Sequence, residues 1–273
     1  MTKELPVLGA ALSLDMIELH RDWLFENNRP IEIQSFCWPT THDGDTPELV
    51  AQAKRLLDGH KGRRGLHGPF MSFRIDCADP EITPVIRHRL LRALEICADL
   101  AADQMVVHSP YGLWTEAEIA TSAVAAAVSF ERVRFVMGPV IDRAERLGVE
   151  LVLENVEDTD PGLRARLAEA LGSPAVKLSL DTGHAQMMHC RCGAPPVDAF
   201  ALAGGAALRH VHLQDVDGFA DRHWHPGEGN IPWKSVFAAL NRLPQMPRLL
   251  LEVADPRALR QGADHLIGLG LAQ

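Results

Sequence analysis

Short apolar runs alternate with longer amphipathic segments along almost the whole chain, and this alternation limits the possible folds more than any other feature. Eight runs of six or seven residues have strand-like composition, and each is followed by a segment whose apolar residues recur at helical spacing. Strands that alternate with helices form a parallel sheet, and eight such units predict a closed (β/α)8 barrel. The expected strands are 6–12, 31–36, 63–68, 104–109, 150–155, 176–181, 209–214 and 248–253.

We expect residues 1–273 to form a single domain. This length fits one barrel, and no linker rich in proline, glycine or serine divides the chain. A doubly wound open sheet is the main alternative. Such a sheet usually carries a glycine-rich phosphate-binding turn after its first strand, and the segment LGAALSLD at 8–15 is not such a turn.

The composition argues against a membrane partner and disfavours nucleic acid without excluding it, because a local basic patch or bound metal cations could reverse the field locally. A net charge of −9 gives no general attraction to nucleic acid or to an anionic membrane. No run of about twenty apolar residues predicts a membrane span, and the N-terminus lacks a signal-peptide pattern. Five cysteines without regular spacing favour a reducing compartment, so we expect a cytoplasmic protein. The HCRC segment at 189–192 has no second cysteine pair and is expected to be an incidental loop feature.

Histidines and acids lie at the C-terminal ends of six consecutive expected strands. In a (β/α)8 barrel these ends form one rim, where the active site lies. A lone histidine there is more often structural, but carboxylates that close the apolar runs LVLE and LLLE would be costly to bury without a cation or hydrogen bonds. The rim residues are His67, His108, Glu154, Asp181, His184, His212 and Glu252.

These rim residues predict a metal site. Converging carboxylates repel one another, and the repulsion raises their pKa values unless a cation compensates. Carboxylate and imidazole together suit Mn, Mg, Co, Fe or Zn, without deciding among them.

Seven motifs in barrel order resemble those of the xylose isomerase-like TIM-barrel superfamily. This superfamily contains the sugar and sugar phosphate isomerases and epimerases as well as the endonuclease IV family, so the resemblance implies the fold more specifically than the reaction. The motifs cover nearly the whole chain and are LHGPF, VVHSP, LVLENVED, SLDTGHA, HVHLQD, HWHPGEGNIPW and LLLEVAD.

The sugar branch of the superfamily implies one divalent metal held by Glu154, Asp181, His212 and Glu252. Glu154 and Glu252 would also transfer the proton, one removing it beside a carbonyl and the other returning it, through a metal-stabilised enediolate. His184 resembles the family histidine that contacts metal or substrate oxygen; a hydrogen bond to a ligand carboxylate is its alternative role. The expected activity is that of an isomerase, an epimerase or a related lyase acting on a sugar or another polyhydroxy carbonyl compound.

The endonuclease IV branch implies up to three zinc ions and cleavage of abasic DNA. Under this alternative, His67, His108, Asp221 and His223 are further metal ligands; in the sugar branch they are metal ligands or substrate contacts. The first strand is unlike that of the endonucleases, and the loop FCWPTTHDGDTPE at 36–48 is acidic. These two features favour a small carbohydrate substrate over nucleic acid. All nine ligand positions carry the required residue type: His67, His108, Glu154, Asp181, His184, His212, Asp221, His223 and Glu252.

One residue departs from the pattern of the ketose 3-epimerases and narrows the activities expected within the sugar branch. Ketose 3-epimerases have an arginine three residues before the proline of the PG turn, and here the residue three before Pro226 is His223. This argues against a free ketohexose 3-epimerase and leaves dehydratases and keto-acid isomerases open. A non-catalytic metal-binding barrel is the least favoured class, because both proton-transfer glutamates are present. Barrels of this type often form homo-oligomers.

Aromatic and histidine side chains complete the expected site. Phe70 and Trp114 are expected to contact substrate, because aromatic rings at a barrel mouth stack on sugars; packing between loops is the alternative. Strand alternation places His210 and His212 on the same inward face, with only His212 at the rim. We therefore expect His210 to be a buried, hydrogen-bonded residue and Asp215 to orient the ligand histidine.

Overall fold

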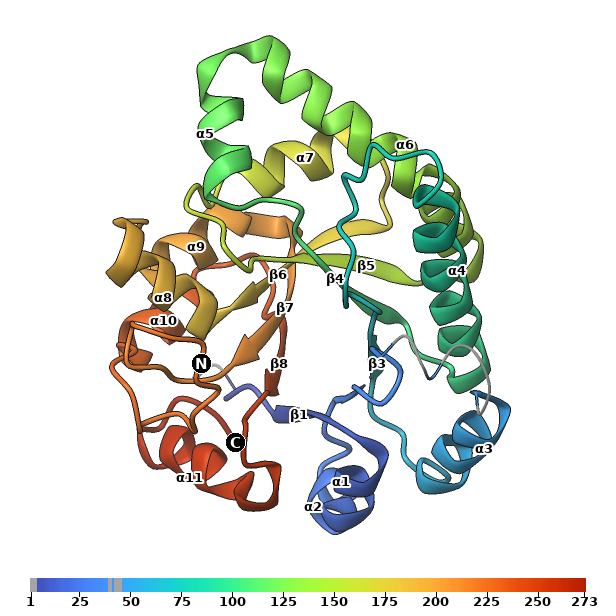
Figure 1. Cartoon of the computed structure of the whole chain (residues 1–273). Helices are drawn as coiled ribbons and strands as arrows, with labels where there is room; N and C mark the ends of the chain where they lie inside the picture. The colour runs from blue at the N-terminus through green and yellow to red at the C-terminus, as the bar shows by residue number, and fades with distance from the viewer. Residues whose placement is uncertain (1–3, 39–40, 42–45) are drawn as a thin grey trace.

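The computed structural model describes residues 4–38, 41 and 46–273, which form a closed barrel of eight parallel strands surrounded by helices (Figure 1). The strands pair in chain order, and β1 pairs with β8 to close the barrel. The single (β/α)8 barrel is thus confirmed, and the open sheet is wrong. The strands are β1 (Leu8–Leu12), β2 (Ile31–Ile33), β3 (Arg64–His67), β4 (Gln104–His108), β5 (Glu150–Glu154), β6 (Val176–Asp181), β7 (Leu208–Leu213) and β8 (Arg248–Leu251).

The helices connect successive strands. The longest, α6, contains Pro139, and α5 together with the start of α6 extends away from the barrel at the top of Figure 1. The helices are α1 (Leu14–Leu19), α2 (Arg21–Glu26), α3 (Thr46–Leu56), α4 (Thr83–Leu100), α5 (Leu113–Thr121), α6 (Ala123–Leu147), α7 (Leu163–Leu171), α8 (Thr182–Cys192), α9 (Val197–Gly204), α10 (Trp233–Leu240) and α11 (Arg260–Gly268). Among the described residues, no helix is both long and apolar enough to cross a membrane.

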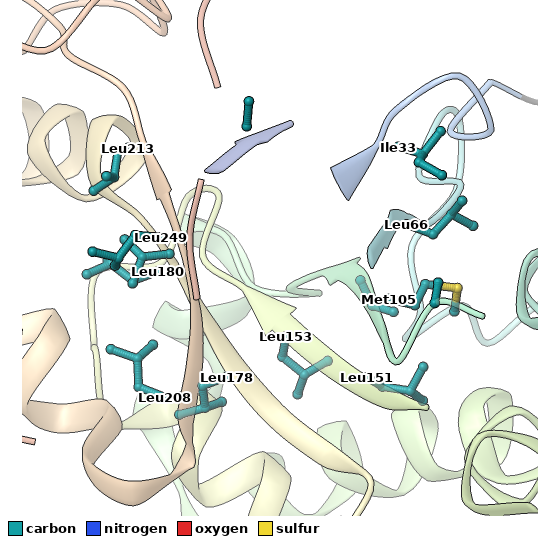
Figure 2. Close-up of a cluster of buried hydrophobic side chains, with 14 of the residues drawn as sticks. Ile33, Leu66, Met105, Leu151, Leu153, Leu178, Leu180, Leu208, Leu213 and Leu249 are labelled. Carbon is teal, nitrogen blue, oxygen red and sulfur yellow. The ribbon is translucent and has the colours of Figure 1, made fainter. Parts of the chain in front are cut away.

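Side chains alternate along each strand between the helix layer and the barrel interior. In β5, Leu151 and Leu153 belong to the continuous apolar core, part of which is drawn in Figure 2, whereas Glu154 lies on the opposite face of the strand. β6 repeats the pattern, with Leu180 in the core and Asp181 facing the interior. The apolar face attaches the strands to the helices, and the interior face carries polar side chains at the rim above apolar residues such as Val106 and Val152. This division brings the rim acids and histidines to one end of the barrel.

Candidate metal centre

The register of the parallel strands aligns the rim residues. His108 pairs with Glu154 across β4 and β5, and Asp181 pairs with His212 across β6 and β7. Because parallel strands end at the same edge, the seven strand-end residues lie at this rim, and the loop after β7 brings Asp221 and His223 to it. They form three groups of mutually close donor atoms: Glu154, Asp181, His212 and Glu252; His67, His108 and Glu154; and His184, Asp221 and His223.

The central group combines three carboxylates with one imidazole. His212 Nδ1 lies 3.0 Å from Glu154 Oε1 and 3.2 Å from Glu252 Oε2. Atoms bound to one metal at about 2.1 Å are about 3.0–3.4 Å apart, so these separations suit a shared divalent ion. Burial alone would lower the pKa of His212, but Glu252, Glu32 and Glu154 raise it well above its ordinary value. The same three carboxylates that stabilise positive charge on His212 would also attract a bound divalent cation.

The second group supplies the clearest test of fit to a metal. Glu154 Oε2 is buried without a hydrogen-bond partner, 3.8 Å from His67 Nε2 and 3.7 Å from His108 Nε2. These distances are too long for hydrogen bonds, yet the three atoms point at a common space. His67 Nδ1 lies 2.9 Å from the Gly68 carbonyl, so it donates there and leaves Nε2 as an acceptor. Burial lowers the pKa of His108 to about 3, so its ring is neutral and able to bind a metal.

The third group lies at the mouth of the barrel. Asp221 Oδ2 is 3.3 Å from His184 Nε2, and Asp221 Oδ1 is 3.2 Å from His223 Nε2. His184 Nδ1 is 2.9 Å from the Asn155 carbonyl, which directs Nε2 toward Asp221. Burial alone would lower the pKa of His223, but the bond to Asp221 and nearby carboxylates raise it to about 9. Glu154 belongs to both the central and the second group, whereas this third group has no residue in common with either.

A cavity of about 800 Å³ opens over the three groups. Its wall includes Gln34, Trp38 and Phe70, and no lysine or arginine lies among the described residues that line it. Asp181 and His212 lie beneath this surface, fully buried. The cavity thus has a floor of candidate metal ligands, and the rest of its described lining is polar, aromatic or apolar.

The two predicted substrate aromatics have different positions. Phe70 lines the cavity and stacks on the His108 ring, with centroids 4.1 Å apart and an interplanar angle of 23°. Trp114 lies in the first turn of α5, is 92% exposed and is outside the cavity lining. Trp38, which the sequence analysis did not select, lines the cavity instead and is about half exposed.

Glu32 is a residue of the site that the sequence analysis missed. It lies in the middle of β2, only 1% exposed, with Oε1 3.0 Å from His212 Nε2 and Oε2 3.0 Å from His210 Nε2. His210 is fully buried, and its Nδ1 lies 2.8 Å from Ser179 Oγ, as expected for a buried hydrogen-bonded residue. Since Glu32 takes one nitrogen of His212, the other faces the central carboxylates. A charged residue between two isoleucines of an interior strand was the available signal.

Glu32→Gln is expected to weaken binding of a divalent metal about 10- to 100-fold, the usual effect of losing a carboxylate that orients a metal-binding histidine. The glutamine amide has nearly the size of the carboxylate, but it has one oxygen that can accept a hydrogen bond where the carboxylate has two. Competition with a chromophoric chelator measures the affinity, and thermal unfolding of the metal-free variant controls for folding. An unchanged affinity would mean that Glu32 does not orient His212.

Asp215 does not have the expected role. Oδ1 accepts hydrogen bonds from Val216 N and Ile231 N, and Oδ2 accepts from Gly227 N and the Trp233 indole. The prediction that it orients the ligand histidine is wrong, because all of these hydrogen bonds hold the turn before α10.

The HCRC segment is not in a loop: it forms the last turn of α8, where Cys190 and Cys192 are exposed free thiols. The acidic 36–48 loop falls partly outside the described residues.

The comparisons with known proteins extend over most of the chain. A profile of the family described as the xylose isomerase-like TIM barrel matches residues 16–269. The uncharacterized protein MJ1311 of Methanocaldococcus jannaschii is 22% identical over 209 residues, which are 72% of this chain and 67% of that protein.

Two solved structures are similar over nearly their full length. The TTHB071 protein from Thermus thermophilus, soaked with ZnCl2, is 25% identical with a TM-score of 0.71, covering 97% of this chain and 99% of that one. The D-allulose 3-epimerase from Methylomonas sp., in complex with D-allulose, is 18% identical with a TM-score of 0.68, covering 98% of each chain. At 18% identity the likeness concerns the fold.

Proposed function

Because the chain belongs to the xylose isomerase-like TIM-barrel family, we propose that it is a divalent-metal-dependent isomerase or epimerase, or a related lyase, acting on a sugar or another small polyhydroxy carbonyl compound. The observation that carries the proposal is the pairing of Glu154 and Glu252 about His212 Nδ1, with both glutamates lining the cavity. The D-allulose 3-epimerase that shares this fold acts on a sugar, so sugars are the first compounds to test.

Glu154, Asp181, His212 and Glu252 would hold the ion. A divalent cation supplies a Lewis acid that polarises the substrate carbonyl and the adjacent hydroxyl. One glutamate removes the proton from the carbon beside the carbonyl, and the other returns a proton on the opposite face or at the neighbouring carbon. The side chain of Glu252 is 13% exposed and that of Glu154 only 1%, so Glu252 is the more accessible base. Gln34 donates a hydrogen bond to Glu252 Oε1 and orients that carboxylate.

The cavity wall supports a neutral substrate. Trp38 and Phe70 provide apolar ring faces for the C–H surface of a sugar, and Gln34 and Thr41 provide hydrogen-bonding groups for its hydroxyls. The described lining contains no lysine or arginine to contact a phosphodiester backbone, and it contains the acids Glu154, Asp221 and Glu252. Trp114 would reach a substrate only through a movement of α5.

A second candidate is a three-zinc phosphodiesterase that acts on abasic DNA. One observation favours it: the nine donors form three groups, two of which share Glu154, and a multi-metal hydrolase needs clustered ions of this kind. The similar Thermus thermophilus protein was soaked with ZnCl2, which makes zinc the first ion to test. We rank this candidate second because the described cavity lining contains no lysine or arginine to contact phosphates.

Elemental analysis and a substrate screen separate the two candidates. We expect protein purified without chelator to contain divalent metal, and the metal-loaded protein to catalyse deuterium exchange from solvent beside the carbonyl of a sugar. EDTA should abolish the exchange and metal should restore it. Metal-dependent nicking of an abasic duplex, without exchange on any sugar, would contradict the isomerase proposal. A protein that binds no divalent metal would overturn both candidates.

A further inference from the structure

Gln214 is a fully buried amide that follows β7 and contacts two of the three donor groups. We propose that this amide is a positioning residue, which fastens the loop carrying Asp221 and His223 to the central ligand Asp181 and thereby sets the metal affinity of the site. The inference rests on the proposed metal site and goes beyond it, because no metal-binding role is otherwise assigned to this side chain.

The partners of Gln214 determine how its amide is oriented. Oε1 lies 3.0 Å from the His223 backbone nitrogen, which can only donate. Nε2 lies 3.1 and 3.2 Å from the two oxygens of Asp181 and 3.1 Å from Asp221 Oδ1, and ionised carboxylates only accept. The reverse orientation would place the amide oxygen against two acids. One side chain therefore joins the central group to the outer group.

The backbone around Gln214 is shaped to fit this amide. A Cβ atom at Gly183 would lie 2.3 Å from both Cδ and Oε1 of Gln214, so any larger residue there would displace the amide. His223 has a φ of +49°, a backbone conformation that non-glycine residues rarely adopt, and its N–H is held by Gln214 Oε1. These two features are independent of the hydrogen bonds to the carboxylates.

The amide also has an electrostatic effect. Asp181 is buried, whereas the side chain of Asp221 is 42% exposed and is held toward the site by His184, His223 and Gln214. Amide hydrogens placed between the two carboxylates offset their repulsion and direct Asp221 inward. Without the amide, the His223 N–H would lose its acceptor, and the link from Asp221 to Asp181 would be lost, so that only His184 and His223 would hold the Asp221 carboxylate. The ligand atoms would then have to be reassembled each time a metal binds.

Two variants remove the link in different ways. Gln214→Met keeps the approximate size of the side chain and removes its polar group, whereas Gly183→Ala keeps the glutamine and displaces it. Each has a matched control. Gln186→Met removes a buried amide of α8 that bonds Asn230 rather than a donor group, and Gly138→Ala adds a methyl group in α6 where no atom lies within 4 Å.

The experiment measures Zn²⁺ and Co²⁺ affinity by chelator competition, and backbone hydrogen exchange of the 217–224 peptide in metal-free protein. We expect at least tenfold weaker binding and faster exchange in both Gln214→Met and Gly183→Ala, with both controls within about twofold of wild type. Wild-type affinity and exchange in either folded test variant would overturn the inference and leave the proposed function standing. A wild-type protein that binds neither ion would overturn both. A role in folding alone would lower the unfolding temperature without changing affinity, which also counts against the inference.

Discussion

Glu154→Gln is expected to lower catalysed proton exchange by at least about 10³-fold and to abolish tight metal binding. The reason is that Glu154 serves two donor groups at once: Oε1 faces His212, and the otherwise unpartnered Oε2 faces His67 and His108. An amide cannot act as a base, and it presents one oxygen where two are needed. Activity is measured on the sugar that the screen identifies, and metal content by elemental mass spectrometry.

Thermal unfolding gives a second measure of the Glu154 variant. A ligand at about a hundred times its Kd stabilises a protein by about 2.7 kcal/mol, so saturating metal should raise the unfolding temperature of wild type and not of Glu154→Gln. Glu150→Gln is the matched control, because Glu150 begins the same strand at the opposite end of the barrel. Its metal content and exchange rate should match those of wild type. Full metal content in Glu154→Gln would contradict the ligand assignment.

Arg164→Met is expected to destabilise the fold by about 3–5 kcal/mol, the usual cost of leaving a buried charge without its partner. Arg164 is 2% exposed, and its Nε lies 3.0 Å from Oδ1 of Asp158, which is itself 1% exposed. Its guanidinium also donates hydrogen bonds to the carbonyls of Leu153 and Ser179, behind the rim. The variant would leave the buried Asp158 carboxylate without a countercharge, with the Ser109 hydroxyl and the Val156 N–H as its hydrogen-bond donors. Chemical denaturation of metal-free protein measures the change.

Arg166→Met tests whether burial causes that cost. Arg166 lies in the same helix and pairs with Asp160 at 2.7 Å, but the two side chains are 54% and 48% exposed. Its loss should change the free energy of unfolding by less than about 1 kcal/mol. Burial raises the pKa of Asp158 to about 6 despite Arg164, so adding Asp158→Asn to Arg164→Met should recover part of the stability. Equal losses in the free energy of unfolding for Arg164→Met and Arg166→Met would show that burial does not cause the cost.

Removing Arg164 should also weaken metal binding, because a buried hydrogen-bond network connects this arginine to the rim. Asn155 Oδ1 accepts from the Asp181 backbone N–H at 2.9 Å, and its amide donates to the Asp181 carbonyl at 2.9 Å. The Asn155 carbonyl in turn orients His184. Residues 153–155 are therefore a structural support for both the central and the outer group, and Arg164 supports them from behind.

The amino-acid sequence by itself predicted the barrel and placed seven of the nine candidate donors at its rim, and the family resemblance added Asp221 and His223. Strand alternation and helical spacing are local periodicities, and the ends of successive parallel strands meet at one rim wherever the barrel closes. For this reason His67, Glu154, Asp181 and Glu252 could be assigned to one site before any contact was known. The inward, buried position of His210 followed from the same alternation.

Only the tertiary structure decided how those donors are grouped and what orients them. Glu32 meets His212 across 180 positions of the chain, and no local pattern encodes such a contact. Gln214 and Asp215 are adjacent polar residues, yet one bonds to the donor groups and the other anchors a turn. The direction in which α5 leaves the barrel places Trp114 in solvent, while the loop after β2 brings Trp38 to the cavity. These outcomes depend on packing between distant segments, because a side chain's partners are set by what the closed barrel brings beside it.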